Sequence, residues 1–295
     1  MGLPVLILHG ILLMIFALAS FSVEDMLIKK MSATLSVGQI ILFVGLGAAL
    51  LLAAACVSTG QSLRDRKAWG ALSWWRMGAE ASAAISLTTA LWLVDFAVFA
   101  AVFQATPLVL IMAAAIFLGE EVGWRRWTAV VIGFCGVLMI IRPGFSGFDP
   151  NALFVLVTVL SITARDLITR QMDKGIPTTV LAFQGFAVMV PVGACLLLLP
   201  GRPSGQVTSL ELMYLVIAVV SGTVAYYALI TSTRIAPTAV ITPFRYTRLL
   251  FSLVIAIFVF QERPDTLTLL GASIIILTGL YTFIRERRLA RAGRM

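Results

Sequence analysis

The most regular feature of the chain is a succession of long apolar runs separated by short polar loops. A helix needs about 20 apolar residues to cross the roughly 30 Å of hydrocarbon in a bilayer. The loops hold proline, glycine and charge, as in "TGQSLRDRK" (59–67) and "PGRPSGQ" (200–206). The pattern therefore predicts ten membrane-spanning helices, at residues 4–26, 36–58, 72–94, 97–118, 124–141, 151–170, 179–200, 211–233, 237–260 and 266–284.

The first apolar run ends in two adjacent acids, Glu24 and Asp25. If the first helix stops near Met26, both acids lie in its last turn at the membrane interface, where charges are tolerated. If the helix runs on to Lys30, both acids lie about 8 Å deeper, at 1.5 Å of rise per residue. Ionisable groups at that depth face a cavity, pair with one another or take part in transport. The sequence leaves both alternatives open.

Composition and charge support a membrane protein with many spans. Apolar residues make up 60% of the chain and charged residues 12%, with a mean hydropathy of +1.01, whereas soluble proteins carry about 25% charged residues. The net charge of +8 matters through its position in the loops, so a nucleic-acid partner is disfavoured. Basic residues concentrate in the loops on the side of the N-terminus, which predicts a multi-pass protein of the cell inner membrane with both termini cytoplasmic. These basic residues include Arg64, Arg66, Lys67, Arg125, Arg126, Arg170 and Lys174.

The chain also repeats itself at a constant offset of 141 residues, which is the separation of Asp25 and Asp166. The matched pairs are Ser20 and Ser161, Asp25 and Asp166, Met31 and Met172, Ala84 and Ala225, Phe103 and Phe244, and Thr106 and Thr247. Each half holds five predicted helices. Because five is odd, the second half must cross the membrane upside down, as in the inverted repeats of secondary transporters. We therefore predict an all-α membrane protein of two inverted five-helix repeats, residues 1–141 and residues 142–295, the second with a basic C-terminal tail.

Four stretches resemble a known family. They are "PLVLIMAAAIFLGEE" (107–121), "ITPFRYTRLLFSLVIAIFVFQERPDTLTLLGA" (241–272), and the polar ends of the two first helices, "VEDMLIK" and "ARDLITR". Together with the ten helices they resemble the EamA-type members of the drug/metabolite transporter superfamily. The resemblance implies two inverted repeats around a central cavity, alternating access, and uptake or export of small metabolites, with amino acids a common substrate class. Many relatives have Trp-Gly-Ser-Asn where this chain has Ser22-Val23-Glu24-Asp25, so its cavity is expected to be more acidic.

Charged residues inside the predicted helices are the first candidates for substrate binding. Arg245 and Arg248 share a helical face, and an arginine binds a carboxylate through two hydrogen bonds. Asp25 and Asp166 would flank a site from opposite repeats. The alternatives are helix ends at the interface for the acids and for Arg165, and snorkelling of the arginines toward the interface. The predicted substrate-binding residues are Glu24, Asp25, Glu80, Arg165, Asp166, Tyr227, Phe244, Arg245 and Arg248.

Several of these candidates have a structural interpretation of equal weight. Arg76 and Glu80 are four residues apart, so they can neutralise each other on one helix. Aromatic side chains can stack on a substrate, although interface belts and packing are their commoner roles. These aromatic candidates are Trp92, Tyr226, Tyr227 and Tyr246.

Two prolines, Pro107 and Pro243, lie in matching helices of the two halves. Within a helix, proline frees a carbonyl and permits a kink. We predict that both act as hinges, and the alternative is that each simply starts a helix.

Catalysis and metal binding find little support in the sequence. The three cysteines, Cys56, Cys135 and Cys195, lie in apolar runs without a CxxC pair or a neighbouring histidine, and the only histidine is His9. The chain has no GxSxG and no Walker-type GxxxxGK[ST] motif. We therefore predict a protein that is not an enzyme, binds no cofactor and no metal, and does not use ATP.

The residues together predict a secondary transporter of small zwitterionic metabolites, with amino-acid export as the first hypothesis. The acids would face the ammonium group and an arginine the carboxylate, with protons as the coupling ion through a cavity carboxylate. One alternative is a carrier of organic cations or S-adenosyl-type metabolites, which the extra acids would suit. Another is a non-transporting membrane partner or a lipid scramblase, for which a polar groove open to the bilayer would be expected.

Overall fold

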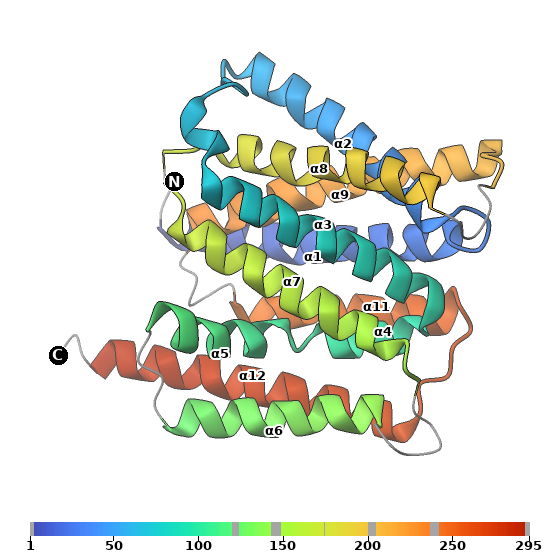
Figure 1. The fold of residues 1–295 in the computed structure, drawn as a ribbon. Coiled ribbons are helices and arrows are strands. Elements are labelled where there is room, and N and C mark those ends of the chain that lie inside the picture. The colour runs from blue at the N-terminus through green and yellow to red at the C-terminus, as the bar shows by residue number, and fades with distance from the viewer. Residues whose placement is uncertain are drawn as a thin grey trace.

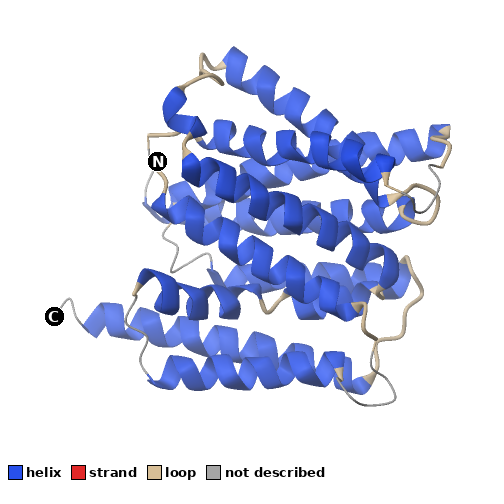
Figure 2. Cartoon of the chain, viewed as in Figure 1, coloured by secondary structure: helices blue, strands red, loops and turns tan. Residues whose placement is uncertain are grey.

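The computed structural model describes residues 3–119, 124–142, 149–173, 175–199, 205–236 and 242–292. Every regular element within these ranges is a helix. Figure 2 shows the helices lying side by side, joined by short connections. The prediction of an all-helical chain is therefore confirmed for the described part.

The helices lie where the apolar runs predict them (Figure 1). They are α1 (Leu3–Met31), α2 (Val37–Ser58), η1 (Arg66–Trp69), α3 (Ala71–Leu93), α4 (Phe96–Phe103), α5 (Thr106–Leu118), α6 (Trp124–Ile141), α7 (Ala152–Gln171), α8 (Thr178–Leu198), α9 (Ser209–Ile235), η2 (Thr242–Tyr246), α11 (Thr247–Phe258) and α12 (Thr266–Ala292). Counting α4 and α5 as one, 6 spans are long and apolar enough to cross a membrane. Among the others, α3 carries two charged residues and α11 has only 12 residues.

The helices of the two halves pack in matching pairs. Under the 141-residue offset, α1, α2 and α3 correspond to α7, α8 and α9. α1 packs along α9, and equivalently α7 packs along α3, while α2 pairs with α8 and α6 with α12. Figure 1 shows α1 and α7 running in opposite directions across the bundle. The two-repeat architecture is confirmed, and the boundary between residues 141 and 142 stays a prediction.

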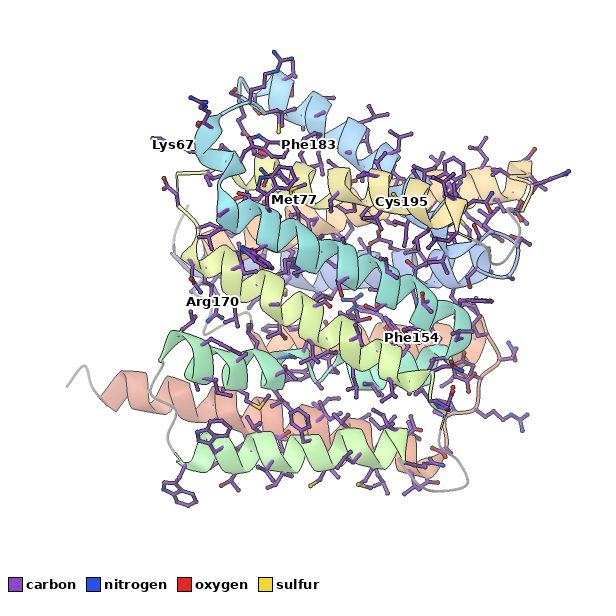
Figure 3. All side chains as sticks on the ribbon, in the orientation of Figure 1. Lys67, Met77, Phe154, Arg170, Phe183 and Cys195 are labelled. Carbon is purple, nitrogen blue, oxygen red and sulfur yellow. The ribbon has the colours of Figure 1, made fainter. Side chains whose placement is uncertain are left out.

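The bundle has two sides. α1 begins and α12 ends on the same side (Figure 1), which we call the terminal side, and we call the opposite side the distal side. In Figure 3, Met77 and Arg170 lie toward the terminal side and Phe154 toward the distal side. The prediction that the terminal side faces the cytoplasm stays a prediction.

The depth of the first pair of acids follows from the length of α1. This helix has 29 residues and continues to Met31, so the alternative in which it stops near Met26 is wrong. A new helix starts only after Ser36, whose side chain forms a capping box with Gln39. Asp25 therefore lies six residues, or about 9 Å, before the distal end of α1.

The fourth predicted span and the described part of the ninth are each interrupted at equivalent positions. α4 ends at Phe103 and α5 begins at Thr106, while η2 leads into α11 at Thr247. The Thr106 hydroxyl donates to the Phe103 carbonyl and the Thr247 hydroxyl to the Phe244 carbonyl, both at 2.6 Å. A backbone carbonyl freed inside a membrane must find another hydrogen-bond donor. In each repeat an equivalent threonine hydroxyl supplies that donor.

Charged side chains hold several helix ends on the distal side. The Glu262 carboxylate accepts hydrogen bonds from the backbone N–H groups of Phe96 (2.7 Å) and Ala97 (2.8 Å), where α4 starts with unpaired N–H groups. Lys29 lies 3.8 Å from Glu262 and donates to the Val94 carbonyl at 2.5 Å. These contacts join the distal ends of α1, α3 and α4 to the segment that follows α11.

Asp265 caps the N-terminus of α12 and ties it to the end of α6. Its carboxylate accepts a hydrogen bond from the Thr268 N–H at 2.8 Å and forms an ion pair with Arg142. The hydrogen bond from the Arg142 side chain, together with those from Thr268, lowers the pKa of Asp265 to about 2. This carboxylate is therefore ionised at every physiological pH.

Glycine allows a close approach of α2 and α8. A Cβ atom at Gly193 on α8 would lie 2.5 Å from the Leu42 backbone nitrogen on α2 and 2.8 Å from the Gly38 carbonyl oxygen. The backbones of α2 and α8 thus touch near the start of α2 and the end of α8, a packing mode that small residues permit in membranes. By contrast, a Cβ atom at Gly78 on α3 would have no neighbouring atom within 4 Å.

We expect Gly193→Ala to lower the free energy of unfolding by about 1–3 kcal/mol, because the added methyl overpacks two backbones. The matched control, Gly78→Ala, adds the same methyl in open space and should be neutral or raise the stability by about 0.5–1 kcal/mol. Thermal unfolding of both purified variants in detergent checks this. A similar midpoint for the two variants contradicts the proposed contact.

Candidate functional site

An ion pair between the two repeats forms the centre of the distal half. Arg248 on α11 donates to the Asp25 carboxylate on α1 at 2.6 Å. The guanidinium lies over two aromatic rings, with its Cζ atom 4.4 Å from the Phe103 ring centroid and 5.4 Å from that of Phe21. Asp25 is 3% exposed. Its charge is therefore compensated by Arg248 rather than by water. Cation–π contacts of this kind stabilise a desolvated arginine further.

Two serines hold the helices that carry this pair. The hydroxyl groups of Ser22 on α1 and Ser252 on α11 lie 3.2 Å apart, and Ser22 also approaches the Arg248 carbonyl oxygen at 3.4 Å. Both serines are buried. The position of Arg248 relative to Asp25 is therefore fixed by polar contacts on either side of the ion pair.

Glu24 is buried without a partner. It is 8% exposed, and within the described part of the chain its carboxylate has neither an ion pair nor a hydrogen-bond donor. Its carboxylate fits against α9 only because residue 222 is glycine, since a Cβ at Gly222 would lie 2.3 Å from Oε1 of Glu24. The two acids and the single Arg248 leave this half of the site with an excess of negative charge.

The terminal half holds a second network of charges. Arg165 on α7 donates to Asp166 at 2.8 and 2.9 Å and to Glu80 on α3 at 3.2 Å. Arg76 on α3 lies 3.8 Å from Glu80. Asp166 thus pairs with an arginine, as Asp25 does, although that arginine comes from its own helix rather than from the other repeat. The four charges of this network balance.

Arg76 is the most deeply buried charge of this network, at 1% exposed. It donates to the Leu181 carbonyl at 2.9 Å, to the Thr169 hydroxyl at 3.0 Å and to the Tyr226 hydroxyl at 3.4 Å. These partners lie on α8, α7 and α9. Arg76 therefore joins four helices, and the predicted pairing with Glu80 is only one of its contacts.

One oxygen of Glu80 remains without a hydrogen bond. Oε2 of Glu80 is buried and has no hydrogen-bond partner. The nearest α8 position is Gly185, where an added Cβ would lie 3.4 Å from this oxygen. Since buried acceptors are nearly always satisfied, this oxygen is a candidate to accept a ligand donor.

Arg245 lies between the two networks. It precedes Arg248 by three residues, close to one helical turn, and Asp166 and Arg165 lie within electrostatic range of it. Its carbonyl accepts a hydrogen bond from the Gln104 side chain at 3.2 Å. Within the described residues its guanidinium has no carboxylate or hydrogen-bond acceptor. A half-buried, unpaired cation thus lies on the path from one network to the other.

The structure groups most of the predicted residues, with two exceptions. Six of them belong to the two networks: Glu24, Asp25, Glu80, Arg165, Asp166 and Arg248. Phe244 instead packs with Met14 and Leu18. Tyr227 is 65% exposed, and its neighbour Tyr226 makes the contact with the charges.

The predicted hinges lie at the interrupted spans. Pro107 is in the first turn of α5, so it starts a helix directly after an interruption. Pro243 lies in η2, and its side chain is outside the described part of the chain. The role of both as hinges stays a prediction.

Sequence analysis missed two residues of the site, Gln104 and Gly222. Gln104 is the counterpart of Arg245, so the repeat itself was a usable signal. Gly222 gave no signal, because its role depends on the side chain of Glu24 in another helix.

A cavity of about 390 Å³ opens on the terminal side between α2, α8 and α9. Its lining is Leu52, Thr59, Gln61, Pro177, Thr178, Thr179, Ala182, Tyr226, Tyr227, Thr231 and Ile235. Within the described residues, no group of three or more histidine, cysteine or acidic side chains is placed to hold a metal ion.

We expect the adjacent acids to affect stability in opposite ways. Asp25→Asn removes the partner of a buried arginine and should cost about 3–5 kcal/mol. Glu24→Gln removes a charge that has no partner and repels Asp25, so the stability should stay equal or rise. Thermal unfolding of the two purified variants separates them, and equal losses would contradict this assignment of the ion pair.

Comparison with known proteins agrees with this architecture. A model of the EamA-like transporter family matches residues 8–142 and again residues 150–284. A solved crystal structure superimposes with a TM-score of 0.68 over 97% of this chain and 99% of that chain, at 17% sequence identity. At that identity the likeness concerns the fold alone.

Two curated relatives are named as transporters. The S-adenosylmethionine uptake transporter of Rickettsia conorii is 30% identical over 186 residues, which cover 62% of this chain and 61% of that protein. The pseudopaline exporter of Pseudomonas aeruginosa is 25% identical over 284 residues, which cover 92% of this chain and 94% of that protein. Because the family model matches nearly the whole chain in two consecutive copies, this multi-pass membrane protein belongs to the EamA-like transporter family.

Proposed function

We propose that the protein is a secondary transporter for a small metabolite that carries an α-amino-acid group, moved by alternating access. The observation that carries this proposal is the buried Glu24 carboxylate and the half-buried Arg245 guanidinium, two opposite charges without a partner among the described residues. An ammonium group would bind at Glu24 and a carboxylate at Arg245. The other charges of the site already have partners within the protein.

The cost of burying charge supports this assignment. An unpaired charge in a membrane span costs about 2.5–3.5 kcal/mol on insertion scales, and such residues face cavities or bind ions and substrates. A zwitterion would neutralise Glu24 and Arg245 together. A carboxylate alone or an ammonium alone would leave one of them unmatched.

A second candidate substrate class is an organic cation or an S-adenosyl compound. The observation that favours it is the excess of acid around Arg248, where Glu24 and Asp25 face one guanidinium. The Rickettsia conorii relative is named for the uptake of S-adenosylmethionine, a compound of this class. An S-adenosyl amino acid combines a zwitterionic group with a further positive charge, so it would satisfy both candidates.

Direction and orientation are part of the proposal. One relative is named for uptake and the other for export, and an alternating-access carrier runs in the direction that its gradients drive. We propose that the terminal side faces the cytoplasm, because the basic loops lie there. Amino-acid export is one direction of the same cycle.

Buried charges also favour a solute carrier over a lipid scramblase or a non-transporting membrane partner. A lipid scramblase would present a polar groove to the bilayer, whereas Asp25 and Arg76 are 3% and 1% exposed. A non-transporting membrane partner would have no need for unpaired charges inside its spans. The positions of these residues therefore support solute transport.

We further propose protons as the coupling ion, with Glu24 as the group that binds them. Asp25 is paired with Arg248 at 2.6 Å, whereas Glu24 has no hydrogen-bond donor or ion-pair partner among the described residues. The charged groups near Glu24 are Asp25 on α1 and Arg248 on α11. Binding of a proton would remove the repulsion between the two acids.

The first test is counterflow in proteoliposomes preloaded with amino acids or with S-adenosylmethionine. We expect wild-type protein to exchange at least one of these compounds and Arg245→Gln to lose at least tenfold in apparent affinity, since a charge-assisted contact is worth about 1.5–3 kcal/mol. Arg64→Gln, at an exposed position in the loop after α2, is the matched control and should exchange normally. Exchange by Arg245→Gln at the wild-type affinity would contradict the proposed carboxylate site.

The second test separates coupling from exchange. A pH gradient should drive accumulation by the wild-type protein, and Glu24→Gln should lose this accumulation while counterflow at equal pH continues with a weaker apparent affinity, because the ammonium group loses its charged partner. The conservative Glu24→Asp keeps a titratable group and should retain part of the accumulation. Accumulation by Glu24→Gln at the wild-type level would assign the coupling group elsewhere.

A further inference from the structure

The cavity between α2, α8 and α9 lies beside the terminal network of charges, because Tyr226 belongs to its lining and accepts a hydrogen bond from Arg76. Its volume of about 390 Å³ falls in the range of about 300–1,000 Å³ that is typical of small-molecule sites. It is formed where α2 and α9 end and α8 begins, so it opens on the terminal side. An amino-acid headgroup alone would leave most of this volume unfilled.

Tyr226 separates the cavity from the charges. Its ring lines the cavity, and its hydroxyl accepts the hydrogen bond from Arg76 at 3.4 Å. The Phe186 ring meets the Tyr226 ring edge-on, with centroids 6.3 Å apart. Contact on both sides holds this ring in place, and a fixed aromatic face is a suitable surface for stacking a flat ligand.

The unsatisfied oxygen of Glu80 lies one turn of α8 beyond the cavity wall. Ala182 lines the cavity, and Gly185, three residues later on the same helix face, packs against Glu80. Three residues correspond to about 4.5 Å along the helix. A ligand in the cavity therefore needs only a short extension to bring a donor to Oε2 of Glu80, which accepts no hydrogen bond and has Arg76 at 3.8 Å.

The remaining walls are apolar with hydroxyl and amide groups at the rim. Leu52 and Ala182 supply apolar surface, and the Thr179 hydroxyl donates to the Gln61 side chain beside the opening. Tyr227, which is 65% exposed, lies at the same opening. Apolar walls with a few polar groups at the edge suit a planar ring system with polar substituents.

We propose that this cavity is a substrate subsite that binds the ring-bearing part of an amino-acid derivative, such as a nucleoside substituent, while the protonated amine of the same molecule donates to Glu80. The inference rests on the proposed transport function and narrows its substrate class to amino acids with a large planar side chain. In this arrangement the Tyr226 side chain lies between the ring of the substrate and its amino-acid headgroup and positions both. The headgroup then passes from Glu80 toward Arg245 and Glu24.

The test compares binding of S-adenosylmethionine and L-methionine, which share the headgroup and differ in the adenosyl group. Isothermal titration of purified wild-type protein in detergent should give at least tenfold tighter binding of the adenosyl compound. Ala182→Leu and Thr231→Leu fill the cavity from two different helices and should remove that preference without changing the affinity for methionine. Glu80→Gln should weaken both ligands.

Thr128→Leu is the matched control, because Thr128 lines a separate cavity of about 400 Å³ beside α6 and α12. It should leave both affinities unchanged. Thermal unfolding of each variant identifies those that fold, and two filling variants on different helices ensure that one misfolded protein does not decide the result.

Three outcomes would overturn the subsite. These are equal affinity of the wild-type protein for the two ligands, an unchanged preference in the folded filling variants, or a phospholipid that copurifies with the wild type and is lost in those variants. In each of these cases counterflow of a small amino acid would still support the proposed transport function. Loss of all counterflow in the wild type would instead contradict the transport proposal itself.

Discussion

The ion pair between Asp25 and Arg248 is the interaction on which the site depends. The two residues come from different repeats, 2.6 Å apart, in a part of the molecule that has little access to water. Removing either partner would leave the other charge buried and uncompensated, which is far more costly than never having had the pair. The pair thus fixes α1 against α11, and it determines which charges remain available. Arg248 is paired with Asp25, whereas Glu24 and Arg245 have no partner among the described residues. Our proposal therefore assigns the ligand and the proton to Glu24 and Arg245.

The two repeats share a scaffold but differ in the charges that they carry. Asp25 and Asp166 occupy equivalent positions, and each pairs with an arginine. In the first repeat the residue before the aspartate is Glu24, whereas in the second it is Arg165. The two halves therefore carry opposite charges at this position, and in sum the first half of the site is acidic, whereas the second half, which also holds Arg76 and Glu80, is balanced. A symmetric scaffold with unequal halves can hold the two ends of a dipolar substrate in a defined orientation.

Hydropathy and the internal offset predicted the helices and the two repeats, because spans must be apolar and repeated segments share a fold. Pro107 and Pro243 indicated where the fourth and ninth spans are interrupted, but the hydrogen bonds from Thr106 and Thr247 that satisfy the backbone there were not predicted. The charges were recognised from the sequence because an ionisable residue in a span stands out. Which charges pair was not predictable, since pairing depends on contacts between helices far apart in the chain. The same limit applies to the tyrosines, because Tyr226 and Tyr227 are adjacent but face different surroundings.

The interruption of the fourth and ninth spans has a mechanical consequence. The fourth span consists of two short helices, α4 and α5, and in the described part of the ninth span the 3-10 turn η2 precedes α11. The hydrogen bond from Gln104 to the Arg245 carbonyl joins these two places. A movement at either place would therefore be passed to the other through this contact. If Pro107 and Pro243 act as the predicted hinges, the two repeats would bend together at the backbone of Arg245, the residue that we propose binds the substrate carboxylate.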